Sequence, residues 1–191
     1  TNVVSSGDKH FKEDIAIGDT TLVSMYNFPL VYGNSKQAFI NNNAAVITES
    51  FAVKLFGTKN AIGKPLSIQT TVAGIEDNYI VSAVLKDIPY NSVTGVIQGN
   101  YSVYIPTSGS RFFSGGDPSE GWDNLNELSF LKLKPGVDAK TVIPLLNGMI
   151  RKYSSDFVWK NLSANMVPVK DYYLNDNDGA VKKMMFILSL I

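Results

Sequence analysis

The sequence predicts an α+β fold with mixed sheets and few helices. Runs rich in β-branched residues at Leu66–Ala73 and Asn78–Lys86 flank a Gly-containing turn, as paired strands do. A capped apolar segment at Thr48–Phe56 is typical of a short helix. Further along, an alternating stretch at Leu128–Lys134 precedes apolar residues that recur at helical spacing as far as Tyr153.

The first third of the chain offers weaker signals. Residues 1–14 are polar and weakly patterned, and Thr21–Leu30 has the character of a strand-like or turn-rich approach to a Phe-Pro pair. Residues 33–43 contain glycine, serine and three consecutive asparagines, which predict a surface loop.

The segment Thr48–Phe56 carries the full chemistry of a helix. Thr48 can accept hydrogen bonds from the first free N–H groups, and Glu49 places negative charge at the positive end of the helix dipole. Gly57 can adopt the left-handed conformation that closes a helix. One face is apolar and should be buried; it comprises Phe51, Ala52, Leu55 and Phe56.

Several strands are expected after this helix. Pro89 should end the strand that begins at Asn78, and Asn100–Ile105 reads as another strand. Residues 107–121, rich in Ser, Gly, Asp and Pro, form the longest irregular stretch. We also predict a strand at Leu128–Lys134 and a last one at Asn165–Val169.

The helix that ends near Tyr153 has two possible starts. Pro135-Gly136 turns the chain before it. If Thr141 caps the helix, Pro144 lies in the first turn, where its missing N–H does no harm. If Asp138 caps it, Pro144 should kink it.

Composition excludes several classes of function. The chain has 191 residues, 45% of them apolar, which supports one large or two small domains. Its net charge is zero, so bulk charge gives no reason to expect nucleic acid or an anionic membrane surface as a partner. The absence of cysteine rules out disulfides, a thiolate nucleophile and cysteine metal sites.

The chain finishes on an apolar run, Met184–Ile191, preceded by two lysines. One interpretation is a C-terminal strand or helix buried in the core. The other is the first turns of a transmembrane helix, because soluble domains seldom expose such a stripe. A full span needs roughly 20 apolar residues, so this run alone does not decide between them.

A set of short segments follows one another in an ordered pattern between about residues 25 and 153. The first group comprises Phe28, Pro29, Leu30, Gly33, Val46, Ile47, Thr48, Glu49, Ser50, Ala52, Phe56, Gly57, Ile62, Gly63, Lys64 and Leu66. The second comprises Val84-Leu85-Lys86-Asp87-Ile88-Pro89, Asn91-Ser92, Trp122 and Phe130-Leu131-Lys132-Leu133-Lys134-Pro135-Gly136. In this order they resemble the MacB-like periplasmic core domain of FtsX-like ABC transporter permeases.

The resemblance implies a non-catalytic, extracytoplasmic domain of a bacterial inner-membrane protein. Such a domain couples ATP hydrolysis in a cytoplasmic ATPase subunit or domain to movement outside the membrane, in export, efflux or the handling of lipoproteins and peptides. The implied partners are that ATPase, a second permease copy and a periplasmic adaptor protein. Flanking helices would connect the domain to the membrane.

The resemblance also implies two lobes. Residues 15–122 would form a middle, sabre-like mixed lobe. Residues 1–14 and 123–180 would belong to a porter-like βαβ lobe whose first half would lie upstream of Thr1. Residues 181–191 would begin a transmembrane helix.

A search for catalytic chemistry gives no catalytic, cofactor-binding or metal-binding residue. His10, the single histidine, could be a general base but has the context of a solvated side chain. One histidine cannot supply a zinc site. Gly57–Pro65 ends in Gly-Lys-Pro, without the Ser or Thr of a nucleotide-binding loop, and it follows a helix instead of opening one.

Two acidic groups are better explained as solvated turns. Asp171, Asp176 and Asp178 with Asn175, Asn177 and Gly179 suggest a calcium loop, but the ligand register fails. Asp117, Glu120, Asp123 and Glu127 around Trp122 could serve a glycosidase, but they lie in a Gly/Ser/Pro loop.

A freestanding secreted domain that binds carbohydrate or peptide is the alternative function, suggested by Trp122 and the many tyrosines. A hydrolase that uses the acidic loop is a third possibility. For the permease domain and its partners, the loops at residues 33–43 and 107–121 are the expected docking surfaces, because function concentrates on exposed loops.

Overall fold

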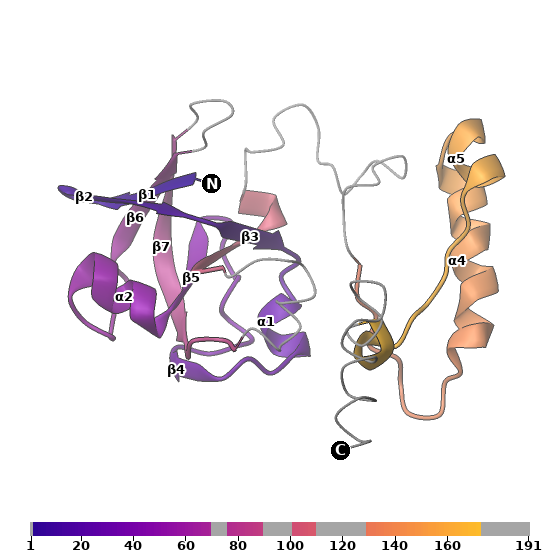
Figure 1. The fold of residues 1–191 in the computed structure, drawn as a ribbon, viewed down its shortest axis with the longest axis horizontal. Helices are drawn as coiled ribbons and strands as arrows, with labels where there is room; N and C mark the ends of the chain where they lie inside the picture. The colour runs from indigo at the N-terminus through magenta and orange to yellow at the C-terminus, as the bar shows by residue number, and fades with distance from the viewer. Residues whose placement is uncertain (1, 70–75, 90–100, 110–128, 173–191) are drawn as a thin grey trace, which may run out of the picture. The chain divides into compact units, whose positions relative to one another are not determined.

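The computed structural model describes residues 2–69, 76–89, 101–109 and 129–172 (Figure 1). The chain divides into two compact units, Thr1–Asp117 and Pro118–Ile191. Each unit is described by itself below.

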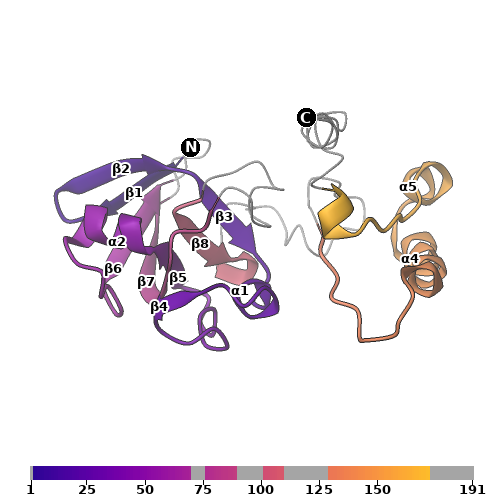
Figure 2. The same ribbon diagram turned by 60° about the horizontal axis from the view of Figure 1, so that its bottom comes forward.

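The described residues of the first unit form an eight-stranded mixed sheet with two short helices (Figures 1 and 2). Its elements are β1 (Asn2–Ser6), β2 (Lys9–Glu13), β3 (Ile15–Gly18), α1 (Leu22–Met25), β4 (Leu30–Tyr32), β5 (Ala44–Thr48), α2 (Glu49–Phe56), β6 (Pro65–Gln69), β7 (Glu76–Leu85), β8 (Val103–Pro106) and the 3-10 turn η1 (Thr107–Gly109). The strand order is β2-β1-β6-β7-β5-β8-β3, and β4 pairs with β7. The pairs β5–β7 and β3–β8 are parallel and the others antiparallel, so the α+β prediction is confirmed.

The long strand β7 organises the sheet. Its first half pairs with β6, in the register Pro65↔Ile80 to Gln69↔Glu76. Its second half pairs with β5 along one edge and with β4 at Leu85 along the other. The predicted pairing of the strands on either side of the Gly-containing turn is therefore confirmed, although residues 70–75 of that turn lie outside the described residues.

Strand β5 lies between two hydrophobic cores, and all five of its residues are buried. Because side chains alternate between the faces of a strand, Ala45 and Ile47 enter one core while Ala44 and Val46 enter the other. A continuously apolar strand such as this one is typical of a sheet covered on both faces.

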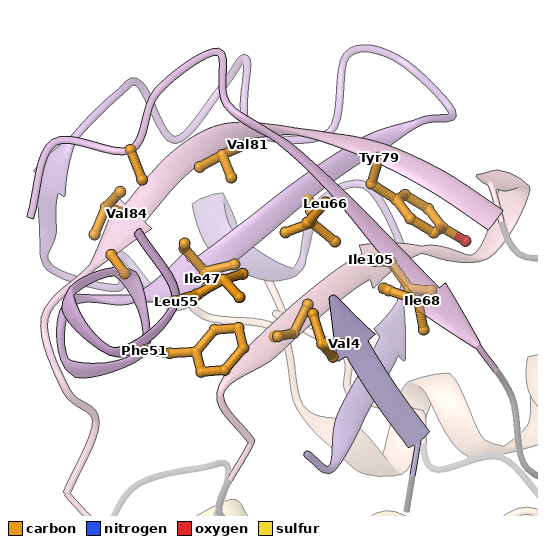
Figure 3. Close-up of a cluster of buried hydrophobic side chains, with 14 residues drawn as sticks. Val4, Ile47, Phe51, Leu55, Leu66, Ile68, Tyr79, Val81, Val84 and Ile105 are labelled. Carbon is orange, nitrogen blue, oxygen red and sulfur yellow. The ribbon is translucent and has the colours of Figure 1, made fainter. Parts of the chain in front are cut away.

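Helix α2 covers the first core (Figure 3). Phe51 and Leu55 each expose 2% of their surface, and Ala52 exposes none. Phe56 is only partly buried and packs against the rim. The buried members of this core are Val4, Ala45, Ile47, Phe51, Ala52, Leu55, Ala61, Leu66, Ile68, Tyr79, Val81, Val84, Val103 and Ile105.

Helix α1 and the loop after β4 close the second core. Its buried members are Ala16, Val23, Phe28, Ala38, Phe39, Ala44, Val46, Ala83, Leu85 and Tyr104. The rings of Phe28 and Tyr104 lie 6.3 Å apart, and Tyr26 stacks on Phe28 at 5.8 Å. Thr21–Leu30, predicted as strand-like or turn-rich, therefore contains a short helix whose Val23 is fully buried.

The end chemistry of α2 is as the sequence predicts. The Thr48 side chain accepts a hydrogen bond from the Phe51 N–H at 3.4 Å, and Gly57 has a left-handed backbone with φ of 72°. The Gly57 N–H donates to the Val53 carbonyl. The helix is thus fixed at both ends by its own local sequence.

The polar N-terminal residues form a hairpin that the sequence pattern did not reveal. β1 pairs with β2 from Asn2↔Glu13 to Ser6↔Lys9, and β1 also pairs with β6. One fully buried side chain, Val4, anchors β1 in the core, which is too weak a signal for a periodicity argument. Residues 2–13 thus belong to the sheet of the first unit.

The described part of the second unit contains α4 (Ala139–Tyr153) and α5 (Asp156–Asn161), which lie side by side (Figures 1 and 2). The Asp138 side chain caps α4 by accepting from the Lys140 N–H at 2.9 Å. Pro144 therefore lies inside the helix, where it cannot donate to the carbonyl of Lys140. Of the two predicted starts, the Asp138 start is the one found.

Two predicted strands of this unit are wrong. Residues 129–134 and 162–168 are irregular, and residues 169–172 are helical. An alternating pattern indicates which side chains could share a face, but a strand also needs a neighbouring strand with which its backbone forms hydrogen bonds. Within the described ranges neither segment has a paired strand, and Leu131 exposes 54% of its surface.

Several predictions lie outside the described residues. They concern the acidic group around Trp122, residues 110–121 of the long loop, the turn at Asn175–Gly179 and the apolar run Met184–Ile191. None of the helices in the described ranges combines the length and hydrophobicity that a bilayer-spanning segment needs.

Candidate functional site

The predicted surface loop at residues 33–43 is held by internal hydrogen bonds and by buried side chains. Asn34 starts it, because its carbonyl accepts from the Gln37 N–H at 3.0 Å and its side chain accepts from the Lys36 N–H at 2.9 Å. Ala38 and Phe39 are buried at its centre and belong to the second core. The loop is therefore held in one arrangement although most of its residues are exposed.

Two contacts tie this loop to β7. Gly33 has φ of 95°, and a Cβ there would lie 2.8 Å from the Ser82 carbonyl, so only glycine fits without displacing the backbone. The Ser82 hydroxyl lies 2.5 Å from the Ala38 carbonyl and 3.1 Å from the Ala45 carbonyl. With one proton to donate, it serves one of these acceptors at a time.

The loop also meets the start of the other predicted docking loop. The Ser108 hydroxyl donates to the Asn42 side-chain oxygen at 3.0 Å, and the Tyr79 hydroxyl donates to the Gly109 carbonyl at 3.0 Å. A Cβ on Gly109 would lie 1.5 Å from the Asn42 carbonyl oxygen, so the two backbones touch. Residues 33–43 and 107–109 thus form one surface, which we call the loop surface.

The loop surface offers contact and hydrogen bonding. Ile40, which belongs to this loop, exposes 69% of its surface. Around it lie the amide and hydroxyl side chains of an Asn- and Ser-rich sequence, with Lys36 as the charged residue of the described loop surface. Amides and hydroxyls bind partners through hydrogen bonds, and a hydroxyl becomes a nucleophile only beside an activating base.

The single histidine belongs to a polar strand pair. His10 on β2 lies opposite Ser5 on β1, and its Nδ1 is 2.7 Å from the Ser5 hydroxyl. Both side chains are on the exposed part of the hairpin. A hydrolytic triad needs a carboxylate to orient the imidazole. In the described ranges no three His, Cys, Asp or Glu side chains gather closely enough to hold a metal ion.

Two backbone donors near the end of the loop between Gly57 and Pro65 are engaged within the protein. The Gly63 N–H donates to the Val81 carbonyl at 2.8 Å, and the Lys64 N–H donates to the Ala61 carbonyl at 3.1 Å. A phosphate-binding loop needs such N–H groups turned toward the ligand. The Gly63 bond docks the loop on β7, and the Lys64 bond closes a turn within the loop.

Several of the ordered motif residues of the first unit lie together near the start of α2. Asp87 accepts from the Ser50 N–H at 3.2 Å and from the Ser50 hydroxyl at 2.6 Å. Glu49 forms an ion pair with Lys59. Next to Asp87, the Lys86 N–H donates to the Pro29 carbonyl at 2.8 Å. The motif that carries the resemblance is therefore a framework that joins β4, α2 and the end of β7.

Three phenols lie in or against the second core: Tyr104 is buried, and Tyr26 and Tyr101 are partly buried. Burial raises the pKa of Tyr26 from 10.0 to about 12 and raises the pKa of Tyr104 further. Burial also raises the pKa of Tyr101, with a smaller effect from the charge of Asp14.

The family described as the MacB-like periplasmic core domain matches residues 1–147. None of the curated proteins matches the chain.

Two solved structures are similar in fold. A domain from Porphyromonas gingivalis, described as part of a permease protein, aligns with a TM-score of 0.55 and 16% identity, covering 91% of this chain and 82% of that one. The periplasmic region of MacB from Actinobacillus actinomycetemcomitans aligns with a TM-score of 0.50 and 16% identity, covering 80% of this chain and 64% of that one.

Proposed function

The chain belongs to the MacB-like periplasmic core domain family of ABC transporter permeases, and from this premise we propose that it transmits motion. ATP binding and hydrolysis in a separate cytoplasmic ATPase would move the membrane helices, and those helices would move this domain outside the membrane. The chain itself would carry out no chemical step.

The observation that carries this proposal is that motif residues fix the positions of a helix and two loops. Thr48, Ser50 and Asp87 fix the start of α2, and Gly33 and Gly63 dock their loops against β7. The Gly33 and Gly63 contacts join two loops to β7, and the Ser50–Asp87 contact joins α2 to the residues that follow β7. Close-packed interiors resist deformation, so such a unit can move as one body and pass a displacement to its surface.

The loop surface is the part of the first unit that we propose meets a partner. Its backbone is fixed by Ser82 and Tyr79, and Ile40 stands exposed on it. A fixed loop with an exposed apolar residue loses little entropy on binding, which favours a protein partner. A periplasmic adaptor and the second permease copy are the partners that suit a transporter.

We further propose the two-lobed division, with one change. Residues 15–122 would form the middle lobe and residues 123–180 would belong to the porter-like lobe. The pairing of β1 with β6 supports counting residues 2–13 with the middle lobe, where the sequence had suggested the porter-like lobe. Residues 181–191 would begin the membrane helix.

Co-purification of the parent protein tests the proposal. The intact parent permease, extracted in detergent, should retain a cytoplasmic ATPase, and the assembly should hydrolyse ATP. The isolated chain should hydrolyse neither ATP nor glycoside or ester substrates. Turnover of any of these by the isolated chain at enzyme-like rates would contradict a purely mechanical role.

A further inference from the structure

Charge is unevenly distributed along this neutral chain. The described part of the second unit, residues 129–172, holds seven basic and three acidic side chains, a net charge of +4. The basic residues are Lys132, Lys134, Lys140, Arg151, Lys152, Lys160 and Lys170. The acidic ones are Asp138, Asp156 and Asp171. The zero net charge of the whole chain therefore conceals a basic segment.

Large apolar side chains are exposed on the same segment. Leu145, Met149 and Tyr153 follow one another at four-residue spacing along α4 and expose 69%, 44% and 53% of their surfaces. Residues at this spacing share one side of a helix. Phe157 at the start of α5 exposes 72%.

Cations and aromatic rings are in contact where α4 meets α5. The Arg151 guanidinium lies 5.1 Å from the Trp159 ring, and the Lys160 ammonium lies 5.2 Å from the same ring. The Lys152 ammonium lies 4.8 Å from the Tyr153 ring. Together with Phe157 these side chains form what we call the basic-aromatic corner.

The one carboxylate at this corner is already engaged. Asp156 accepts from the Lys160 ammonium at 2.6 Å and from the Trp159 indole at 3.1 Å. The hydrogen bond from Lys160, and then that from Trp159, lowers the pKa of Asp156. The carboxylate offsets one of three cations, so the corner keeps a net positive charge.

We propose that the basic-aromatic corner lies on the surface of a phospholipid bilayer that contains anionic lipids. The proposal rests on the proposed function, since it requires a domain tethered beside a membrane. Exposed Tyr, Trp and Phe with Lys and Arg are the side chains that settle at the headgroup level. The predicted membrane helix begins at residue 181, nine residues after Tyr172, a span of at most about 30 Å.

The test is binding of the whole chain to vesicles, with Trp159 as the probe. Replacing Trp122 with Phe leaves Trp159 as the single tryptophan. Vesicles of phosphatidylcholine and phosphatidylglycerol at 3:1 should shift Trp159 emission to the blue and bind the chain. Vesicles of phosphatidylcholine alone should do both far less. Binding should weaken as salt rises, because exposed charges are screened.

Substitutions distinguish vesicle binding by the basic-aromatic corner from binding by the rest of the chain. The triple variant Arg151→Gln, Lys152→Gln, Lys160→Gln should bind anionic vesicles about a hundredfold more weakly, at roughly fivefold per charge removed. The matched control is Lys9→Gln, Lys12→Gln, Lys86→Gln, three exposed cations of the first unit, which should bind as the parent chain does. Phe157→Ser should reduce the blue shift while circular dichroism stays unchanged.

The outcomes distinguish the alternatives. Equal binding by the triple variant and the parent chain would overturn the proposal and assign the binding to another segment, such as residues 184–191. Self-association that the triple variant abolishes, without vesicle binding, would make the corner a protein interface and would also overturn it. If the corner does not bind vesicles but ATP still drives movement of the domain, only the membrane proposal is wrong and the proposed function stands.

Discussion

Truncation of Leu55 to alanine tests the packing of α2 most directly. The side chain exposes 2% of its surface and lies in the first core beside Phe51 and Ile47. Replacing a buried leucine with alanine lowers the free energy of unfolding by about 2–5 kcal/mol. The loss depends on how far the site can collapse around the cavity. Collapse requires the helix to move.

Helix α2 has little freedom to move into such a cavity. Thr48 and Asp87 hold its first turn, Gly57 closes its last turn, and Lys54 pairs with Glu13 on β2 at 2.5 Å. We therefore expect Leu55→Ala to lower the free energy of unfolding by about 3–5 kcal/mol, the upper part of the range.

Urea unfolding followed by far-ultraviolet circular dichroism measures this loss. Val53→Ala on the same helix is the control, because Val53 exposes 44% of its surface and its truncation should change stability by less than about 0.5 kcal/mol. A loss below about 1 kcal/mol would refute the placement of this helix face.

Three further predictions concern the loop surface, the start of α2 and alkaline pH. Gly109→Ala should push the two loop backbones apart at Asn42, and hydrogen exchange in residues 37–43 should rise without loss of the sheet. Asp87→Ala and Ser50→Ala should each cost about 1 kcal/mol, and the double variant little more than either, as a double-mutant cycle in urea would measure. Because the unfolded Tyr104 phenol loses its proton near pH 10.0 while burial preserves it in the fold, unfolding free energy should fall above that pH, and less so in Tyr104→Phe.

Local chemistry made the helix α2 predictable from sequence. A threonine cap, an apolar face and a closing glycine act within about ten residues, so Thr48, Leu55 and Gly57 stand where the sequence implies. The pairing of β6 with β7 was predictable for the same reason, because the two strands are close neighbours in the sequence.

Features that depend on distant partners were not predictable. Ser50 and Asp87 are 37 residues apart, and Asn42 and Ser108 are 66 apart, so neither pair leaves a local signal. The convergence of the two loops into one surface therefore emerges only in the structure. The weak pattern of β1 is overridden in the same way, by its pairing with β6.

The second unit shows where pattern reasoning fails in the opposite direction. Alternation at residues 129–134 predicted a strand, but in the described ranges that segment pairs with none. The apolar spacing of α4 correctly predicted a helix, yet none of its residues is buried. Periodicity identifies the side that could be covered and says nothing of what covers it.

The central claim, that ATP use moves this domain, can be measured as a distance. The chain has no cysteine, so Ile40→Cys on the loop surface accepts a spin label at a site that is 69% exposed. The assembled parent transporter holds two permease copies in the proposed arrangement, and therefore two labels. Pulsed electron paramagnetic resonance reports the distance between them. The account predicts that the distribution shifts when ATP is trapped at the ATPase and returns when nucleotide is removed. Identical distributions in both states of a transporter that still hydrolyses ATP would contradict it.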